Sequence, residues 1–206
     1  MSGSGTMGGF SLLEVMLTLM IVTFGILGIA NLQAKAQLAQ LDAYQRAQAL
    51  MTMSDIVDRL LLNRSTASCF AFTDDTAVGT PYIGTDGANH LGTPVCTVGD
   101  AALNAMAVDA IDDFDELLKG AAETKDGGNV GAMVGARACI SYDSATELTT
   151  TGGALLDGTG EYTIAVVWQG QGDSAPSTAS NCAYGLYGAE TKRRVVTTKV
   201  RLAHLS

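Results

Sequence analysis

The sequence lacks the short motifs around which many enzyme active sites are built. It contains no nucleophile elbow, phosphate-binding loop, dinucleotide fingerprint or H-E-x-x-H zinc motif. Histidine occurs only twice, and we interpret His90 and His204 as ordinary surface residues because they lie in a turn-rich stretch and at the tail of the chain. No pattern brings a nucleophile and a base, or two carboxylates, into one cleft. We therefore expect no enzymatic activity and no cofactor.

Basic residues are also scarce. The chain has 12 Lys and Arg against 21 Asp and Glu, with a formal net charge of −9. A nucleic-acid-binding surface needs clustered cations, so we expect no nucleic-acid partner. Five of the acids lie on one helical face: Asp109, Asp112, Asp113, Asp115 and Glu116. A helix does not provide the loop of alternating ligands that calcium prefers, so we expect this face to be solvated and metal-free.

Proline is nearly absent, with three residues in the chain, and helix breakers are missing from residues 31–63. This segment is rich in Ala, Leu, Gln and Met, which are good helix formers. We predict one continuous helix from Phe10 to about Asn63, with weak points only at Gly25 and Gly28. The expected apolar stripe of its second half comprises Leu38, Leu41, Tyr44, Ala47, Met51, Ile56, Leu60 and Leu61.

The first half of this helix is the most distinctive stretch of the sequence. Residues 10–30 are apolar apart from Ser11, Thr18, Thr23 and Glu14. About 20 apolar residues at 1.5 Å each match the hydrocarbon core of a bilayer, which predicts a membrane-spanning helix. An ionisable side chain inside such a segment is costly and indicates a function for Glu14. The alternative is that Glu14, four residues after Phe10 and near one end of the segment, lies in the headgroup layer.

Four cysteines, Cys69, Cys96, Cys139 and Cys182, follow the membrane segment. They form no C-x-x-C motif and have no nearby histidine pair, so a zinc site is not expected. An even number of cysteines beyond an export signal indicates disulfides in an oxidising compartment. Three pairings are possible, and we prefer Cys69–Cys96 with Cys139–Cys182.

The remaining chain is predicted to form an α+β domain. Residues 64–99 are dense in turn signals and are expected to form a connection. A short helix follows, capped by Thr97 or Asp100 and stopped by Gly120. Its expected apolar stripe comprises Leu103, Met106, Ala107, Ile111, Phe114, Leu117 and Leu118.

The last part of the chain contains three β-rich runs, at residues 136–142, 162–169 and 193–203. In the last run, alternate residues from Val195 to Arg201 are predicted to face one way and those from Val196 to Leu202 the other, which suits a sheet with one face on a core. We expect an antiparallel sheet packed against the long helix. In this arrangement Cys182 staples its loop to the first strand through Cys139.

The order Gly9-Phe10-Ser11-Leu12-Leu13-Glu14, leading directly into the apolar run, resembles the processing signal of type IV pilins and type II secretion pseudopilins. The resemblance implies that a prepilin peptidase cuts between Gly9 and Phe10 and that the new terminus at Phe10 is N-methylated. It also implies that Glu14, as the fifth mature residue, pairs with the terminal amine of a neighbouring subunit and sets the axial register. Residues 1–9 carry no Lys or Arg, whereas leaders of this family usually do.

Over roughly the first 64 residues, and more loosely through Trp168 and Cys182, the chain resembles the PilV-type minor pilins, the type IV pilus modification proteins. The resemblance implies a pilin-like fold divided into a leader (1–9), a membrane-spanning helix half (10–31), an amphipathic helix half (32–64) and a globular domain (65–206). It implies a subunit held in the inner membrane, with its globular domain in the periplasm, before it joins a pilus at the cell surface.

The implied partners are other minor pilins, the major pilin, the prepilin peptidase and the inner-membrane assembly platform. Two other functions remain open from the sequence. One is a minor pseudopilin of a type II secretion system, which shares the same amino-terminal chemistry. The other is a single-span periplasmic binding module, for which the Gly9 to Glu14 match would be accidental.

Overall fold

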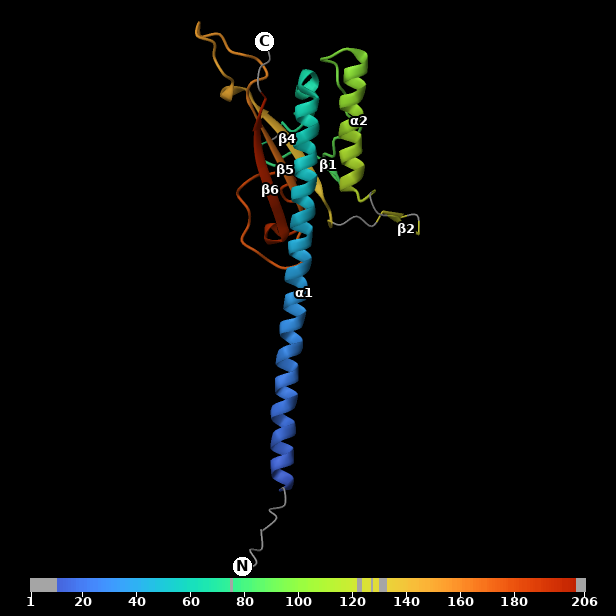
Figure 1. Ribbon diagram of the computed structural model, residues 1–206, viewed down its shortest axis with the longest axis vertical. Helices are drawn as coiled ribbons and strands as arrows, with labels where there is room; N and C mark the ends of the chain where they lie inside the picture. The colour runs from blue at the N-terminus through green and yellow to red at the C-terminus, as the bar shows by residue number, and fades with distance from the viewer. Residues whose placement is uncertain (1–10, 75, 122–123, 127, 130–132, 203–206) are drawn as a thin grey trace, which may run out of the picture. The chain divides into compact units, whose positions relative to one another are not determined.

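A computed structural model describes residues 11–74, 76–121, 124–126, 128–129 and 133–202. The chain is of the α+β class, with a long amino-terminal helix and a four-stranded antiparallel sheet (Figure 1). It divides into two compact units, one ending at Leu41 and one beginning at Asp42.

The elements follow one another in a simple order. They are α1 (Leu12–Leu62), the 3-10 helix η1 (Arg64–Phe70), β1 (Ile83–Gly84), α2 (Ala101–Leu118), β2 (Thr124–Lys125), β3 (Gly128–Asn129), β4 (Arg137–Asp143), η2 (Ser144–Thr146), β5 (Glu161–Gln169), η3 (Glu190–Lys192) and β6 (Arg193–Arg201). The short strands β1, β2 and β3 were not expected from the sequence. Strand β1 lies in the stretch that had been predicted as a plain connection.

Helix α1 is continuous over 51 residues, as its lack of helix breakers predicted. Its expected start at Phe10 lies outside the described residues. At the other end, the Asn63 side chain donates a hydrogen bond to the carbonyl oxygen of Arg59 at 2.9 Å. The chain then tightens into η1, so the helix ends where the sequence predicted.

The predicted apolar stripe of the second half of α1 is wrong in part. The buried residues there are Gln45, Ala49, Thr52, Ile56 and Leu60. Ile56 and Leu60 were expected, but Tyr44 and Met51 are 50% and 66% exposed. Both sets recur at helical spacing, and the face buried in the globular unit includes Gln45 and the small residues Ala49 and Thr52 in place of the exposed Tyr44 and Met51.

The sheet has the strand order β1-β4-β5-β6, with all neighbours antiparallel. Strand β5 is central and pairs with β6 over nine residues, from Glu161 opposite Arg201 to Gln169 opposite Arg193. The three β-rich runs predicted from the sequence correspond to β4, β5 and β6, although Ala203 lies outside the described residues. In Figure 1, α2 lies beside the carboxyl-terminal part of α1 next to the sheet.

The main core lies between one face of this sheet and the helices. Ile140 and Val166 of the sheet join Ile56 of α1, Phe114 of α2 and Phe70 of η1 in one buried cluster. Val196 of β6 and Leu202, which follows the strand, are buried in this cluster and belong to one of the two alternating sets predicted for this run. The opposite face of the sheet carries a second, smaller cluster beneath the loop that contains Cys182.

Helix α2 begins as predicted, with the Asp100 side chain accepting a hydrogen bond from the Leu103 N–H at 2.9 Å. The buried residues include Ala107, Ile111 and Phe114, as expected. Two expectations for α2 are wrong. Met106 is 58% exposed, and Asp115, predicted to lie on the solvated acidic face, is buried because it faces β1.

Candidate functional site

Glu14 lies in the first turn of α1. The turn starts at Ser11, whose carbonyl oxygen accepts hydrogen bonds from the N–H groups of Glu14 and Val15 at 3.0 and 3.3 Å. Ser11 Oγ also accepts a hydrogen bond from the Leu13 N–H at 3.4 Å. The acid therefore sits at the positive end of the helix dipole, which favours a carboxylate. Gly9 and Phe10, the expected cleavage and methylation residues, lie outside the described residues.

The helix around Glu14 is long and apolar enough to cross a membrane. The mean hydropathy of its most apolar 18-residue window is 2.3. Every described side chain up to Leu41 is exposed. The hydroxyl groups of Thr18 and Thr23 donate hydrogen bonds to carbonyl oxygens three residues earlier, at 2.9 and 2.8 Å. These two polar groups therefore need no water, which suits a hydrocarbon environment.

Glu14 has no cationic partner within its own helical segment. The first basic residue after it is Lys35. A separation of 21 residues along an α-helix corresponds to about 31 Å, which is far beyond ion-pair distance. If this segment is in a membrane, the carboxylate must be neutralised by protonation, reach the headgroup layer, or find a positive charge on another molecule.

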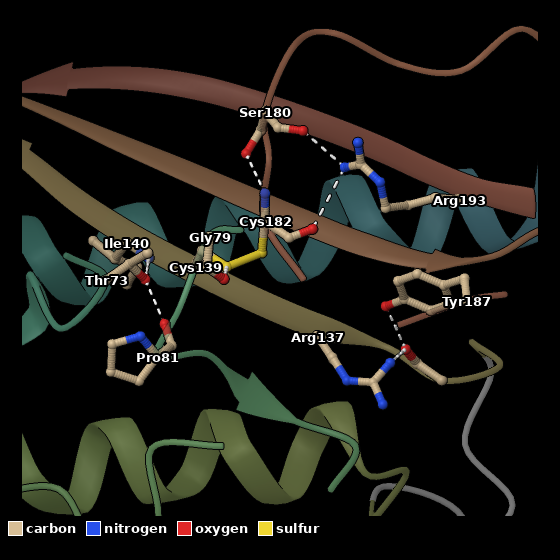
Figure 2. The surroundings of a disulfide bond; sticks show 11 residues. Thr73, Gly79, Pro81, Arg137, Cys139, Ile140, Ser180, Cys182, Tyr187 and Arg193 are labelled. Carbon is tan, nitrogen blue, oxygen red and sulfur yellow. Dashed lines mark hydrogen bonds between the residues drawn. A yellow bond between two sulfur atoms is a disulfide. The ribbon is translucent and has the colours of Figure 1, made fainter. Parts of the chain in front are cut away.

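The disulfides of the globular unit are Cys69–Cys96 and Cys139–Cys182, which are the two pairs preferred from the sequence. The second pair joins β4 to the loop before η3 on the outer face of the sheet (Figure 2). Beside it, Thr73 Oγ1 donates a hydrogen bond to the Pro81 carbonyl at 2.8 Å and accepts one from the Ile140 N–H at 3.1 Å.

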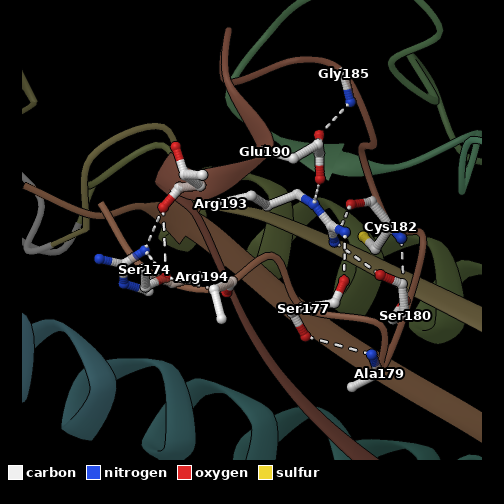
Figure 3. A network of polar contacts seen from close by, with 11 residues as sticks. Ser174, Ser177, Ala179, Ser180, Cys182, Gly185, Glu190, Arg193 and Arg194 are labelled. Carbon is white, nitrogen blue, oxygen red and sulfur yellow. Dashed lines mark hydrogen bonds and ion pairs between the residues drawn. The ribbon is translucent and has the colours of Figure 1, made fainter. Parts of the chain in front are cut away.

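Arg193, a buried residue, also holds the loop that contains Cys182. Its side chain is 1% exposed, and its Nε donates a hydrogen bond to Glu190 at 2.6 Å. The remaining guanidinium nitrogens donate to the carbonyl oxygens of Ser177 and Ser180 at 3.1 and 2.7 Å (Figure 3). A planar, forked donor satisfies several carbonyls at once, so this arginine acts as a structural clamp. The sequence carried no signal for this role.

Arg137 and Tyr187 form a second contact between β4 and this loop. The guanidinium carbon of Arg137 lies 5.2 and 5.1 Å from the ring centres of Tyr82 and Tyr187. Tyr187 donates a hydrogen bond to the Gly135 carbonyl at 2.8 Å (Figure 2). Burial raises the pKa of Tyr187 to about 12, although Arg137 acts in the opposite direction. The phenol therefore stays neutral and serves as a hydrogen-bond donor.

A polar cluster joins α2 to β1. Asp115 accepts hydrogen bonds from the Gly84 N–H at 2.7 Å and from His90 Nε2 at 2.8 Å, and its other oxygen lies 2.6 Å from Lys119 Nζ. The Gly92 N–H donates to His90 Nδ1, which assigns the proton to Nε2. The expectation that His90 is an ordinary surface residue is therefore wrong, because its side chain is 14% exposed and bonded to Asp115. His204 lies outside the described residues.

The pKa of Asp115 follows from this geometry. Burial acts to raise the pKa, but the hydrogen bonds from Lys119, Gly84 and His90 outweigh it and lower the pKa below its ordinary value. The hydrogen bond with Asp115 in turn raises the pKa of Lys119. The cluster therefore contains a carboxylate and an ammonium held in their charged forms, which is the signature of a structural pair.

One cavity of the globular unit lies beside the Cys139–Cys182 disulfide and has a volume of about 160 Å³. Thr76, Ser141, Thr163 and Asn181 contribute side chains to its lining, so it can form hydrogen bonds but contains no acid–base pair. Among the described residues, no three His, Cys, Asp or Glu side chains are placed to hold a metal ion.

No known protein family matches the chain, and neither the curated proteins nor the solved structures contain a match.

Proposed function

We propose that this chain is a minor pilin, a structural subunit that helps to prime the assembly of a type IV pilus and joins it through α1. The observation that carries the proposal is the position of Glu14. It is the only ionisable residue between Ser11 and Gln33, and it lies in the first turn of an exposed apolar helix directly after the Gly9-Phe10 dipeptide.

The physical reason is charge neutralisation. Cleavage after Gly9 creates a free amine on Phe10, and no cation of the described segment lies near Glu14. In a bundle of parallel helices, the carboxylate of one subunit meets the terminal amine of the next, so each charge offsets the cost of burying the other. That pairing also sets the axial offset between neighbouring subunits.

Two further features support the proposal. In the globular unit, α1 exposes Tyr44 and Met51 on the side away from its core, and an exposed apolar helix face is typical of a protein-interaction surface. The two disulfides suit a domain that is exported to the periplasm and then displayed at the cell surface. The partners in this proposal are the major and minor pilins, the prepilin peptidase and the assembly platform.

The first test determines the amino terminus of the protein in sheared surface fibres and in membranes by mass spectrometry. Fibre-associated protein that begins at methylated Phe10 is the expected result. Protein processed at Phe10 but confined to the membrane would instead indicate a minor pseudopilin of a type II secretion system. A chain with no cleavage anywhere would leave a membrane-anchored periplasmic binding module and exclude a pilin.

The second test addresses Glu14 directly. Glu14→Val should leave cleavage intact but reduce incorporation into fibres about tenfold or more, because the neighbouring amine loses its partner. Thr18→Val is the matched control, since it changes a polar residue of the same span whose hydroxyl is already bonded within its own helix. Quantitative immunoblots of fibre and membrane fractions give the comparison. Incorporation of Glu14→Val at the wild-type level would contradict the register role.

A further inference from the structure

One edge of the four-stranded sheet is formed by β6. Strand β6 is the last strand in the order β1-β4-β5-β6 and has a neighbour on one side only. It pairs with β5 without interruption over all nine residues, so it contains no bulge. It also contains no proline or glycine. Proteins usually interrupt or cover such edges, because a regular edge strand is a template for another strand.

The register determines which backbone groups of β6 point outward. The N–H of Gln169 donates to the Val134 carbonyl on the β4 side, whereas the N–H of Gly170 donates to the Lys192 carbonyl on the β6 side, both at 2.8 Å. Successive residues of an antiparallel strand alternate in this way. The backbone groups of the even-numbered residues of β5 therefore form hydrogen bonds with β6. The backbone groups of the even-numbered residues of β6 form the same hydrogen bonds with β5.

The odd-numbered residues of β6 consequently direct their backbone groups away from the sheet. Apart from Arg193, whose N–H donates to the Glu190 carbonyl, these residues are Val195, Thr197, Lys199 and Arg201. Within the described part of the chain, no other segment forms a hydrogen bond with their N–H or carbonyl groups. The loop after β5 reaches only the start of the strand, where the Ser174 N–H donates to the Thr191 carbonyl at 2.9 Å.

The charge of this edge opposes that of the whole chain. Residues 192–201 contain five of the twelve Lys and Arg and no acid, in a protein with a net charge of −9. The first three of these cations form ion pairs: Lys192 with Asp173, Arg193 with Glu190, and Arg194 with Asp42. Lys199 and Arg201 are exposed along the free edge. Lys199 forms an ion pair with Glu161 of β5, whereas Arg201 donates a hydrogen bond to the Thr146 carbonyl and forms no ion pair with any described carboxylate.

We propose that the outer edge of β6, from Val195 to Arg201, accepts an extended acidic segment of another polypeptide as a fifth strand. The backbone of that segment bonds to the outward groups of Thr197 and Lys199, and its acidic side chains lie opposite Lys199 and Arg201. A second copy of β6 is a poor occupant, because it would bring the cations of both copies together. The proposal does not rest on the function proposed above.

The test uses the full chain in detergent and two synthetic ten-residue peptides. One alternates Glu with Val and Thr, and the other carries Lys in place of each Glu. Amide hydrogen exchange is measured by NMR with peptide in enough excess to occupy about 90% of the sites, so that exchange at the outward amides slows about tenfold. We expect this protection at Thr197 and Lys199 with the acidic peptide and not with the basic one.

Matched variants separate backbone pairing from charge. Thr197→Pro removes one outward N–H and should abolish the protection at Lys199, whereas Thr197→Val keeps the N–H and should retain it. Lys199→Glu combined with Arg201→Glu should reverse the preference between the two peptides. The fluorescence of buried Trp168 verifies that each variant is folded. Equal protection by both peptides, or none at Thr197 and Lys199, would overturn the proposal.

Discussion

Asp115 differs from the other acids of α2 because its carboxylate faces the protein. Its neighbours Asp112 and Asp113 are exposed, although Asp113 pairs with Arg59 of α1. Asp115 instead bonds to β1, to His90 and to Lys119. Burial acts against the charged form of Asp115, and the three hydrogen bonds more than offset it, so that the pKa is lowered. At the scale of one residue, this carboxylate fastens α2 to the edge of the sheet.

We predict that Asp115→Asn lowers the free energy of unfolding by about 2 kcal/mol at pH 7, because Lys119 and His90 lose their charged acceptor. Asp112→Asn is the matched control on the same helix. Burial and the neighbouring acids Asp115, Asp109, Asp113 and Glu116 raise the pKa of Asp112, so its removal should be neutral or slightly stabilising. Urea denaturation followed by the fluorescence of Trp168 measures both.

The pH dependence provides an independent check on Asp115. A carboxyl group whose pKa is lowered by folding stabilises the protein above its unfolded pKa, and that contribution is lost as the pH falls through the folded value. The difference between wild type and Asp115→Asn should therefore be complete above about pH 4 and shrink in more acidic solution. A constant difference down to pH 2 would argue against the charged pair.

At the scale of elements, the two disulfides hold segments that have little regular structure. Cys69–Cys96 joins η1 to the loop before α2, and Cys139–Cys182 joins β4 to the loop that Arg193 also holds. The loops that they close contain 28 and 44 residues, counting both cysteines, from separations of 27 and 43. The chain-entropy relation gives similar stabilisation for the two, roughly 4 kcal/mol each.

We predict that replacing Cys139 and Cys182 together by Ala lowers the free energy of unfolding by about 4 kcal/mol. It should also expose residues 177–190 to proteases, since only noncovalent contacts, such as those of Arg193 and Tyr187, then secure the loop. The matched Cys69→Ala, Cys96→Ala variant should lose similar stability without new cleavage at residues 177–190. Urea titration and mass-resolved limited proteolysis distinguish the two losses. Identical cleavage patterns would contradict the local role assigned to Cys139–Cys182.

At the scale of the whole molecule, the described side chains up to Leu41 add nothing to the hydrophobic core. The first buried residues of α1 are Gln45 and Ala49, and every member of the main core cluster follows Asp42 in the chain. The membrane-length segment and the folded unit thus share one helix while depending on separate interactions for their stability.

We predict that residues 42–206, exported behind a cleavable signal, form both disulfides and unfold at the same urea concentration as the full chain in detergent. The matched truncation, residues 50–206, lacks Gln45, Ala49 and the Asp42–Arg194 contact. It should be less stable by at least about 2 kcal/mol. If the longer fragment were unfolded, part of the stability would have to come from residues before Asp42.

The sequence alone predicted the features that depend on neighbouring residues. The long helix followed from the absence of breakers, the membrane-length segment from its apolar run, and α2 from its cap and spacing. The three long strands followed from their β-rich composition, and the alternation predicted for β6 left to the structure which of its two faces is buried. Cleavage after Gly9, methylation of Phe10 and the role of Glu14 remain predictions from the sequence.

The tertiary structure decided which residues distant in the chain meet. The buried face of α1 was predicted only in part, because two faces have helical spacing and only the packing of the folded chain selects Gln45, Ala49 and Thr52. The bond between His90 and Asp115 and the clamp made by Arg193 join residues that share no local pattern. The free edge of β6 likewise depends on strand order, which follows from how the whole chain packs rather than from any single segment.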